Sequence, residues 1–345
     1  MEGPRAPTDI EFPQVVEFLD QRLRNQVSWS IAKEYPTALS KTNLHNMRII
    51  SNGPEILSHA VLKPLIVKTP HMVLKVGAIG SVVTDEKHRG HCYSTKIIEA
   101  CLAEAQQQTC DIAVLWSGIP EFYQKMGFKL AGFEESYVIE KPLATTATKL
   151  QFKKGSQIAP EALLRLYQQH TVTTHRTVDE LRKYMQIPNA QIYTAWGPQG
   201  TLEAFAVEGK GADLTDYIHE WAGNVSALFG LFNWILAEKK KGFVLITPKH
   251  SNNLRVQLLS QEVTYNSGFL GMIKILNPAS MIQKLVKAQS ALGGEPIDFT
   301  GLNEQEFIEA LFGPWSEAIT DKLPISAVKS GLLPLRFWLW GWDSI

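Results

Sequence analysis

The stretch "SVVTDEKHRGHCYSTKIIEACLAEA", residues 81–105, decides the fold because its periodicity changes in the middle. It begins as a β-branched run, breaks at a charged turn around Arg89 and Gly90, and continues with apolar residues at helical spacing. The first turn of a helix has unsatisfied backbone N–H groups and carries about half a positive charge. Small residues there let an anion such as a pyrophosphate approach closely, and an arginine adds charged donors.

A simpler reading of this turn remains open. Arg89 fits a surface arginine and Gly90 fits a turn glycine that supplies unusual backbone angles. The sequence contains neither the GxxxxGK[ST] pattern of a P-loop nor the GxGxxG pattern of a dinucleotide-binding fold. The motif is therefore neither of those two common phosphate-binding loops.

Composition sets limits on the class of protein. The chain has 345 residues and 45% hydrophobic content, which predicts a globular protein of about two domains. Lysine plus arginine equals aspartate plus glutamate at 34 each, so no net charge attracts nucleic acid or an anionic membrane. The N-terminal residues lack the pattern of a secretory signal, and no run approaches the roughly 20 apolar residues of a membrane span. We expect a cytoplasmic protein that binds neither nucleic acid nor membrane.

The three cysteines, Cys92, Cys101 and Cys110, show neither CxxC nor Cys/His metal spacing. They argue against a disulfide framework and against a structural zinc site. We expect no metal, and we expect Cys101 to lie in a core.

The first part of the chain predicts a mixture of helices and strands. Helices are expected at 12–23, 29–39, 93–108 and 119–128, and strands at 47–51, 55–67, 72–84, 111–117 and 129–140. The first three strands form an antiparallel meander. Because 72–84, the helix and 111–117 make a strand–helix–strand unit, those two strands should be parallel neighbours.

The second part repeats this order after the polar linker "LATTATK" (143–149). It predicts helices at 160–170, 177–185 and 225–238, a hairpin at 190–209, and strands at 216–223 and 242–248. This repetition indicates a diverged internal duplication. Residues 265–276 weakly resemble 123–139, a further helix is expected at 303–313, and the tryptophan-rich tail should pack on the body.

The stretch "VVTDEKHRGHCYSTKIIE" resembles motif A of the GCN-five-related N-acetyltransferases (GNAT), in which a strand, an Arg-x-x-Gly-x-Gly/Ala loop and a helix bind the pyrophosphate of acetyl-CoA. About 30 residues later, "PEFYQKMGFKLAGFE" resembles motif B of that family. The resemblance covers residues 1 to about 142. It implies an α/β (α+β) GNAT fold, with a mixed antiparallel and parallel sheet flanked by helices, and acetyl-CoA as cosubstrate without a metal.

The resemblance implies a set of cofactor-binding residues. They are Val82, Val83, Thr84, Arg89, Gly90, His91, Cys92, Tyr93, Ser94 and Ser117. Main-chain groups at Val82 and Val83 would pair with the pantetheine arm. Two positions depart from the family pattern, because Cys92 stands where glycine is usual and Ser94 where glycine or alanine is usual. Backbone N–H donors do not depend on side-chain identity, so the departures put affinity in question, not the binding mode.

The resemblance also implies the catalytic residues. Tyr123 would donate a proton to the departing thiolate, and a tyrosine's ordinary pKa of about 10 keeps it protonated at neutral pH. The alternative is a packed core tyrosine. Candidates for the base that receives the amine proton are Glu34, His45, Asp85 and the terminal carboxylate of Ile345, which the residues alone do not rank. No His/Asp pattern supports Cys92 as a nucleophile.

The tandem order is similar to that of acetyltransferases of the enhanced-intracellular-survival type, in which a terminal carboxylate enters the active site. It implies an acetyltransferase domain at 1–145, a degenerate GNAT-like domain at 146–290 and a C-terminal helical and aromatic tail at 291–345. In the second domain "AGNVSALFG" keeps Gly223 but has no arginine, so one cofactor site is expected. By this analogy Ile345 joins Tyr123 as the second expected catalytic residue.

The expected function is acetyl-CoA-dependent transfer of an acetyl group directly to a primary amine, either a small polycationic amine or a lysine or peptide amine. The alternative is a non-catalytic acyl-CoA-binding or regulatory module with a degenerate GNAT site. The acceptor is the expected partner, and the sequence leaves homo-oligomerisation open.

Overall fold

The computed structural model describes residues 1–146 and 149–345, so two residues of the expected linker, 147–148, lie outside the described residues. The chain divides into two compact units that share segments. Unit 1 comprises Met1–Gly132, Phe269–Trp338 and Ile345, whereas unit 2 comprises Phe133–Gly268 and Leu339–Ser344. The compact units are thus discontinuous, in contrast to the contiguous ranges 1–145, 146–290 and 291–345 expected from the sequence.

Unit 1 is built on one mixed sheet. Its strands are β1 (Glu2–Arg5), β2 (Met47–Asn52), β3 (Glu55–Lys68), β4 (Val73–Thr84), β5 (Ile112–Leu115), β6 (Lys129–Ala131) and β15 (Gly271–Ile275). They lie in the order β1-β2-β3-β4-β5-β15-β6. Strands β2, β3 and β4 form the expected antiparallel meander, and β4 pairs with β5 in parallel, as predicted.

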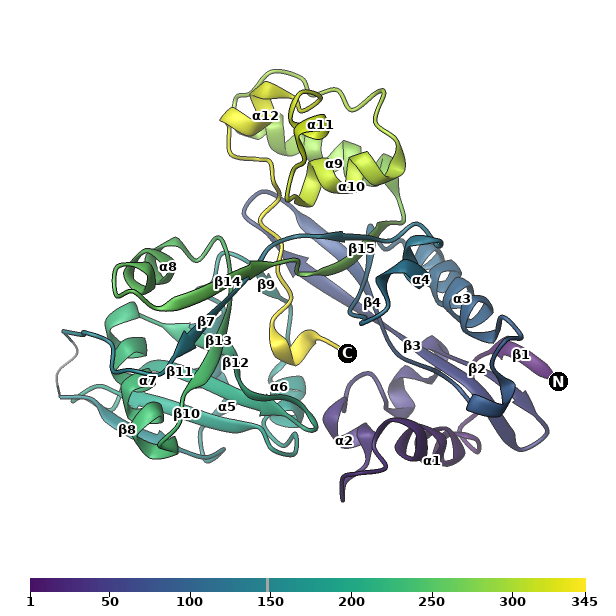
Figure 1. Cartoon of the computed structure of the whole chain (residues 1–345), viewed down its shortest axis with the longest axis horizontal. Helices are drawn as coiled ribbons and strands as arrows, with labels where there is room; N and C mark the ends of the chain where they lie inside the picture. Colours follow the sequence, from purple (N-terminus) through teal and green to yellow (C-terminus); the bar gives the residue numbers. More distant parts are fainter. Residues whose placement is uncertain (147–148) are drawn as a thin grey trace. The chain divides into compact units, whose positions relative to one another are not determined.

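Helices cover both faces of this sheet. Helix α3 (Tyr93–Gln107) packs on one face, while α1 (Phe12–Leu23) and α2 (Ile31–Glu34) pack on the other (Figure 1). The predicted apolar stripe of α3 is buried as expected, and it consists of Ile97, Ile98, Cys101, Leu102 and Ala105. The two faces follow from strand alternation: Leu62 of β3 packs under α3, and its neighbour Val61 packs under α1.

The remaining helices of unit 1 lie in both of its sequence segments. They are η1 (Lys41–Asn46), η2 (Glu86–His88), α4 (Pro120–Gln124), α9 (Pro278–Ala291), α10 (Glu304–Phe312), α11 (Glu317–Thr320) and α12 (Ile325–Lys329). Buried Asp111, just before β5, connects β4 to α9. Its carboxylate accepts hydrogen bonds from the backbone N–H of Lys75 in β4 at 2.7 Å and from Ser280 and Lys284 of α9 at 2.8 and 2.5 Å.

Unit 2 repeats this architecture. Its strands are β7 (Glu134–Ile139), β8 (Gln151–Lys154), β9 (Thr173–Thr174), β10 (Gln191–Trp196), β11 (Leu202–Lys210), β12 (Asp213–Gly223), β13 (Phe243–Pro248) and β14 (Thr264–Gly268). Its helices are α5 (Pro160–Tyr167), α6 (Val178–Tyr184), α7 (Val225–Lys239), α8 (Asn252–Leu259) and η3 (Gly341–Asp343). The sheet order β8-β10-β11-β12-β13-β7-β14 matches that of unit 1 position by position. Strands β12 and β13 are the parallel pair. The expected internal duplication is confirmed.

The matching orders reveal an exchange of strands. In each sheet, the sixth strand comes from the other half of the sequence. Strand β15 lies between β5 and β6, and strand β7 lies between β13 and β14. The single closing strand expected at 129–140 is therefore wrong. Gly132 has a φ of +74°, which ends β6, and a Cβ built on it would lie 2.8 Å from Leu270 Cβ. Beyond that turn, β7 joins the other sheet.

The tryptophan-rich tail is packed, as expected. Trp338 in unit 1 and Trp340 and Trp342 in unit 2 are 2%, 1% and 1% exposed. Within the described residues no helix combines the length and the apolar character that crossing a membrane requires.

The strand exchange predicts how the chain responds to dissection. A chain that ends at residue 145 retains β5 and β6 but lacks β15, so the unfilled edge exposes apolar residues and backbone groups. We expect this fragment to show no cooperative thermal unfolding by circular dichroism. Residues 1–132 joined by a short glycine–serine linker to 269–338 should unfold cooperatively, because Gly132 already lies against Leu270. Cooperative unfolding of the first fragment would contradict the importance of the exchange.

Candidate active site

The candidate site begins where two parallel strands separate. The pairing of β4 with β5 ends at Ala78 and Val114, although β4 continues to Thr84 beside β3. Val82 and Val83 thus lie beyond the last residue of β4 that pairs with β5. An extended ligand can add to such a strand edge through main-chain hydrogen bonds.

A β-bulge shapes the separated part of β4. The register with β3 shifts between the pairs His59–Val83 and Val61–Gly80, and Ser81 in between has a φ of +49°. A bulge bends its strand and increases the local twist. The bulge therefore directs the end of β4 away from β5.

Buried His59 of β3 holds this bulge in place. Its Nδ1 lies 2.9 Å from the carbonyl oxygen of Ser81, and because a carbonyl only accepts, Nδ1 carries the hydrogen. Nε2 is then a lone-pair acceptor, and among the described residues it has no hydrogen-bond partner. Burial lowers the pKa of His59 to about 4. Sequence reasoning missed this residue, and the available signal was a histidine within the apolar run 55–67.

The loop after β4 carries the expected arginine. Arg89 follows η2, and its Nη2 lies 3.3 Å from Glu86 Oε1 in an exposed pair, which contributes little stability. Gly90 has a φ of +83°, and a Cβ added there would meet nothing within 4 Å. His91 is exposed, and its Nδ1 lies 3.0 Å from the carbonyl oxygen of Arg89. Arg89 and Gly90 therefore stand open to solvent ahead of α3.

Helix α3 begins in a way that suits an anion. Cys92 is its N-cap in a left-handed conformation, with φ 59° and ψ 23°, and no side chain caps the helix. The left-handed region costs a residue with a Cβ roughly 1–2 kcal/mol, which gives a physical reason for the glycine usual at this position. Tyr93 follows as a buried first residue of the helix. The uncapped N–H groups remain available to an anion.

Hydroxyl groups connect this helix start to the end of β4. Ser94 Oγ lies 2.8 Å from Thr84 Oγ1, which in turn lies 2.8 Å from Ser58 Oγ in β3. A larger side chain at Ser94 would disturb this chain of hydrogen bonds. The structure thus brings Thr84 and Ser94 together, and it gives Ser94 a positioning role that the sequence did not suggest.

Tyr123 and Ser117 meet beyond the end of β5. Tyr123 lies in α4, is 7% exposed, and packs edge-on against Phe122 and Phe128. Burial raises the pKa of its phenol, while a hydrogen bond with Ser117 acts in the opposite direction. The hydroxyl is therefore protonated at neutral pH.

The last residue of the sequence lies on β4. A Cβ built on Gly80 would be 2.5 Å from the carboxyl carbon of Ile345 and 2.6 Å from its oxygen. The side chain of Ile345 packs with Val83 against the cluster under α1. The terminal carboxyl group is thus adjacent to the bulge at Ser81, on the face opposite α3.

Comparisons with known proteins bear on this geometry. Residues 4–131 match the family model of the acetyltransferase (GNAT) domain. This part of the chain therefore has the GNAT fold, and residues 4–131 are called the GNAT domain below. No curated protein matches the sequence.

Solved structures extend the likeness to the tandem arrangement. A probable N-acyltransferase of unknown function from Enterococcus faecalis V583 has a TM-score of 0.62 at 15% identity, covering 81% of this chain and 74% of that one. A GCN5-related N-acetyltransferase from Kribbella flavida has a TM-score of 0.60 at 13% identity, covering 80% and 71%. Eis1 from Mycobacterium abscessus has a TM-score of 0.54 at 13% identity, covering 81% and 75%. These likenesses show the fold, which is a tandem of two GNAT-like units.

Acetyl-CoA is the cosubstrate of the GNAT family, and several features of residues 4–131 suit it. The uncapped start of α3 and the open turn at Gly90 suit a pyrophosphate, and the free edge at Val82 and Val83 suits an amide-bearing arm. When bound, acetyl-CoA supplies the activated acetyl group. No cluster of three or more His, Cys, Asp or Glu side chains suited to a metal ion occurs in residues 1–146 and 149–345.

Two acidic candidates for the base are engaged in ion pairs. Glu34 is fully buried, with its oxygens 2.8 Å from Arg24 Nε and 2.6 Å from Trp29 Nε1. Asp85 accepts from Arg22 Nε at 3.0 Å, and that guanidinium holds the pKa of Asp85 below its ordinary value. Both carboxylates act as structural ion-pair partners of the GNAT domain.

His45 differs because it is exposed, in η1, with its Nε2 3.1 Å from Asn46 Nδ2. The carboxyl group of Ile345, the fourth base candidate, lies directly against Gly80 of β4.

His59 predicts an acid-sensitive fold. Its pKa is lowered from the ordinary 6.5 to about 4, so between these values the unfolded chain binds a proton that the folded GNAT domain does not. The contribution is fully present above about pH 6.5 and is lost as pH falls toward 4, on the order of 3 kcal/mol. His59→Gln should flatten the dependence of urea-unfolding free energy on pH across this window. His45→Gln, at an exposed histidine, is the control, and an unchanged slope in His59→Gln would contradict this origin.

Proposed function

We propose that the protein is an acetyl-CoA-dependent N-acetyltransferase that transfers the acetyl group directly to a primary amine, either a small polycationic amine or a lysine or peptide amine. The observation that carries this proposal is the separation of β4 from β5 directly before the uncapped start of α3. The GNAT model match over residues 4–131 supports it independently.

The proposed reaction needs two proton transfers. The neutral amine nitrogen attacks the thioester carbonyl, a C–N bond forms, the C–S bond breaks, and the sulfur leaves as a thiolate. Tyr123 gives its phenolic proton to that thiolate, which its raised pKa permits at neutral pH. The excess proton on the amine nitrogen passes to a base. Main-chain N–H groups at the bulge of β4 would polarise the thioester carbonyl.

The first prediction concerns Arg89, a cation next to the turn that suits a phosphate. Its ion pair with Glu86 is exposed and therefore weak, so the guanidinium is available to a ligand. Arg89→Ala should weaken acetyl-CoA binding about tenfold, equal to roughly 1.4 kcal/mol for a charge-assisted contact. Isothermal titration calorimetry measures this directly. Cys92→Gly should strengthen binding or raise thermal stability, because glycine adopts the left-handed N-cap angles without the Cβ penalty.

Lys87→Ala is a matched control, since Lys87 is an exposed cation of the same loop outside the proposed site. Wild-type protein that binds no acetyl-CoA would overturn the proposed function. Binding unaffected by Arg89→Ala would overturn the role of this arginine alone.

Tyr123→Phe tests the proton donor. The ring remains in its packed position, so acetyl-CoA affinity should stay within about twofold, whereas kcat should fall by a factor of roughly 10²–10⁴ typical of a lost general acid. Steady-state kinetics with CoA release as the readout separates kcat from KM. Phe122→Leu, at a neighbouring half-buried ring, serves as control, and unchanged turnover in Tyr123→Phe would reject the acid role.

We further propose that the carboxylate of Ile345 receives the amine proton. It lies on β4 beside the bulge, while Asp343, the other acidic group near the chain end, is buried in an ion pair with Arg176 at 2.7 Å.

A semisynthetic chain ending in Ile345 carboxamide retains the side chain and removes the charge. We expect kcat to fall at least tenfold, and the acidic limb of the kcat–pH profile to disappear. Gly80→Ala, whose Cβ would displace the carboxyl group, should lower kcat as well, whereas Gly118→Ala, where a Cβ meets nothing within 4 Å, should not. Full activity of the carboxamide would exclude this base.

A further inference from the structure

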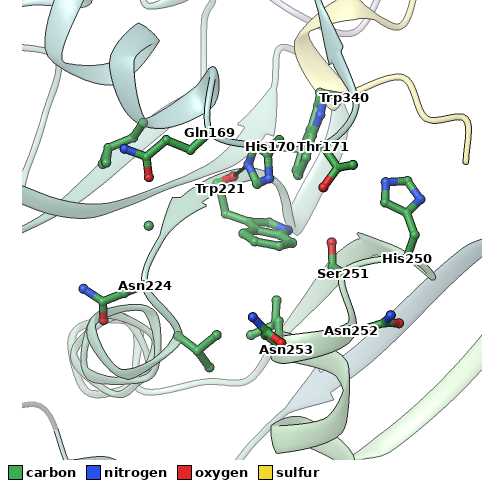
Figure 2. A pocket seen from close by; sticks show the side chains of 14 residues that line it. Gln169, His170, Thr171, Trp221, Asn224, His250, Ser251, Asn252, Asn253 and Trp340 are labelled. Atoms are coloured by element: carbon green, nitrogen blue, oxygen red, sulfur yellow. Dashed lines mark hydrogen bonds between the residues drawn. The ribbon is translucent and has the colours of Figure 1, made fainter. Parts of the chain in front are cut away.

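Unit 2 contains a cavity that the proposed reaction does not use. Its volume is about 430 Å³, within the range of small-molecule sites, and its lining comes from four segments of unit 2. They are the end of α5 with the following residues, the turn between β12 and α7, the turn between β13 and α8, and Trp340. Figure 2 shows the polar side chains of these segments surrounding Trp221.

The cavity occupies the position in unit 2 that corresponds to the candidate active site of unit 1. Strands β12 and β13 pair in parallel at Tyr217–Val244 and Ile218–Leu245 and then separate. Trp221 and Gly223 lie on the separated end of β12, and α7 begins directly after. The same constraint that opens a site in unit 1 therefore opens one here.

The lining is nevertheless unsuited to acyl-CoA. Trp221 Nε1 donates to the carbonyl oxygen of Ile246 at 3.1 Å, so its indole reaches across the gap between the strands where a pantetheine arm would add. The N-terminus of α7 is capped by Asn224, whose Oδ1 accepts from Ala227 N at 2.8 Å. Among the described residues that line the cavity there is no lysine, arginine, aspartate or glutamate. A pyrophosphate thus finds neither a free helix start nor a cation.

The described aromatic side chains that line the cavity offer it no free indole N–H donor, and Trp221 and Trp340 are 4% and 1% exposed. The indole N–H of Trp221 is used by Ile246, and that of Trp340 donates to Val172 O at 3.0 Å. His170 Nε2 donates to Trp221 O at 2.7 Å, and burial lowers the pKa of this imidazole to about 4, so it is neutral at physiological pH. An uncharged ring ligand can contact the edges of these aromatic groups without leaving a charge desolvated.

Several polar side chains of the lining are available to hydrogen-bond a ligand. The side chains of Gln169, Thr171, Ser251, Asn252 and Asn253 have no hydrogen-bond partner within the part of the chain that the structure describes. Three carboxamides offer donors and acceptors together, which is the pattern that pairs with the edge of a nucleobase or with sugar hydroxyls. A cavity lined by aromatic and carboxamide groups thus suits a ligand that has a flat face and a polar rim.

We propose that this cavity binds an uncharged ring ligand with hydrogen-bond donors and acceptors at its edge, of the nucleoside or sugar type, independently of the acetyl-CoA site in unit 1. The proposal assigns unit 2 a binding role of its own. It depends on the lining residues of unit 2 and does not depend on the proposed transfer reaction.

The experiment uses the full chain and three probes: adenosine, maltose and ADP. Binding is measured by isothermal titration calorimetry and by saturation-transfer NMR up to millimolar concentration. Gln169→Ala and Asn253→Ala, at exposed lining residues, should each weaken binding of the uncharged probe about fivefold, which corresponds to one lost hydrogen bond. Gln168→Ala, at the exposed residue next to the lining, is the matched control and should have no effect.

Adenosine binding with this pattern, unchanged by Arg89→Ala, supports the proposal and identifies a nucleoside. Maltose binding with the same pattern supports the shared chemistry and identifies a sugar. No binding of either uncharged probe overturns the proposal, as does uncharged-probe binding that Gln169→Ala and Asn253→Ala leave unchanged. ADP that binds more tightly than adenosine through Gln169 and Asn253 also overturns it, because the ligand would then be anionic. Each of these outcomes can be measured even if the protein does not bind acetyl-CoA. Failure of the transferase proposal can therefore be told apart from failure of this one.

Discussion

The structure depends on one constraint, which is that two parallel strands separate after a few paired residues. In unit 1 the pairing of β4 and β5 stops at Ala78 and Val114, and a bulge fixed by His59 bends β4 away. Every proposed function of unit 1 follows from this separation. It frees main-chain groups for a ligand, places the start of α3 at the open end, and provides a position for the carboxyl group of Ile345 against Gly80.

The second unit shows that the same backbone constraint permits a different chemistry. There the gap is spanned by Trp221, and the helix start is occupied by Asn224. In unit 1 the corresponding helix has no cap, and Cys92 tolerates left-handed angles to provide that turn. Trp221, Asn224 and the absence of a cation among the described residues of the lining thus make the opening in unit 2 less suited to an anion than the opening in unit 1. The duplication preserved the architecture, while the side chains at the opening diverged.

Much of this could be predicted from the sequence, because local patterns carried it. The apolar stripe from Ile97 to Ala105, the parallel pair and the repeated element order all follow from periodicity. The pairing partners of residues 134–139 and 271–275 could not be predicted, since alternating strands specify a face but not a neighbour. His59 and Ser94 were missed as positioning residues for a related reason. Their roles depend on a bulge and on a hydroxyl of another strand, which no spacing in the sequence reveals.

The exchange of β7 and β15 has a consequence for synthesis on the ribosome. Residues 112–131 emerge early, yet the strand that lies between β5 and β6 is made only when the ribosome reaches 271–275. During that interval the nascent chain carries an unpaired apolar edge, which is the surface that chaperones bind and that aggregates form from. The same exchange ties the two halves of the gene together, because neither copy can be lost or recombined without leaving a gap in the sheet of the other.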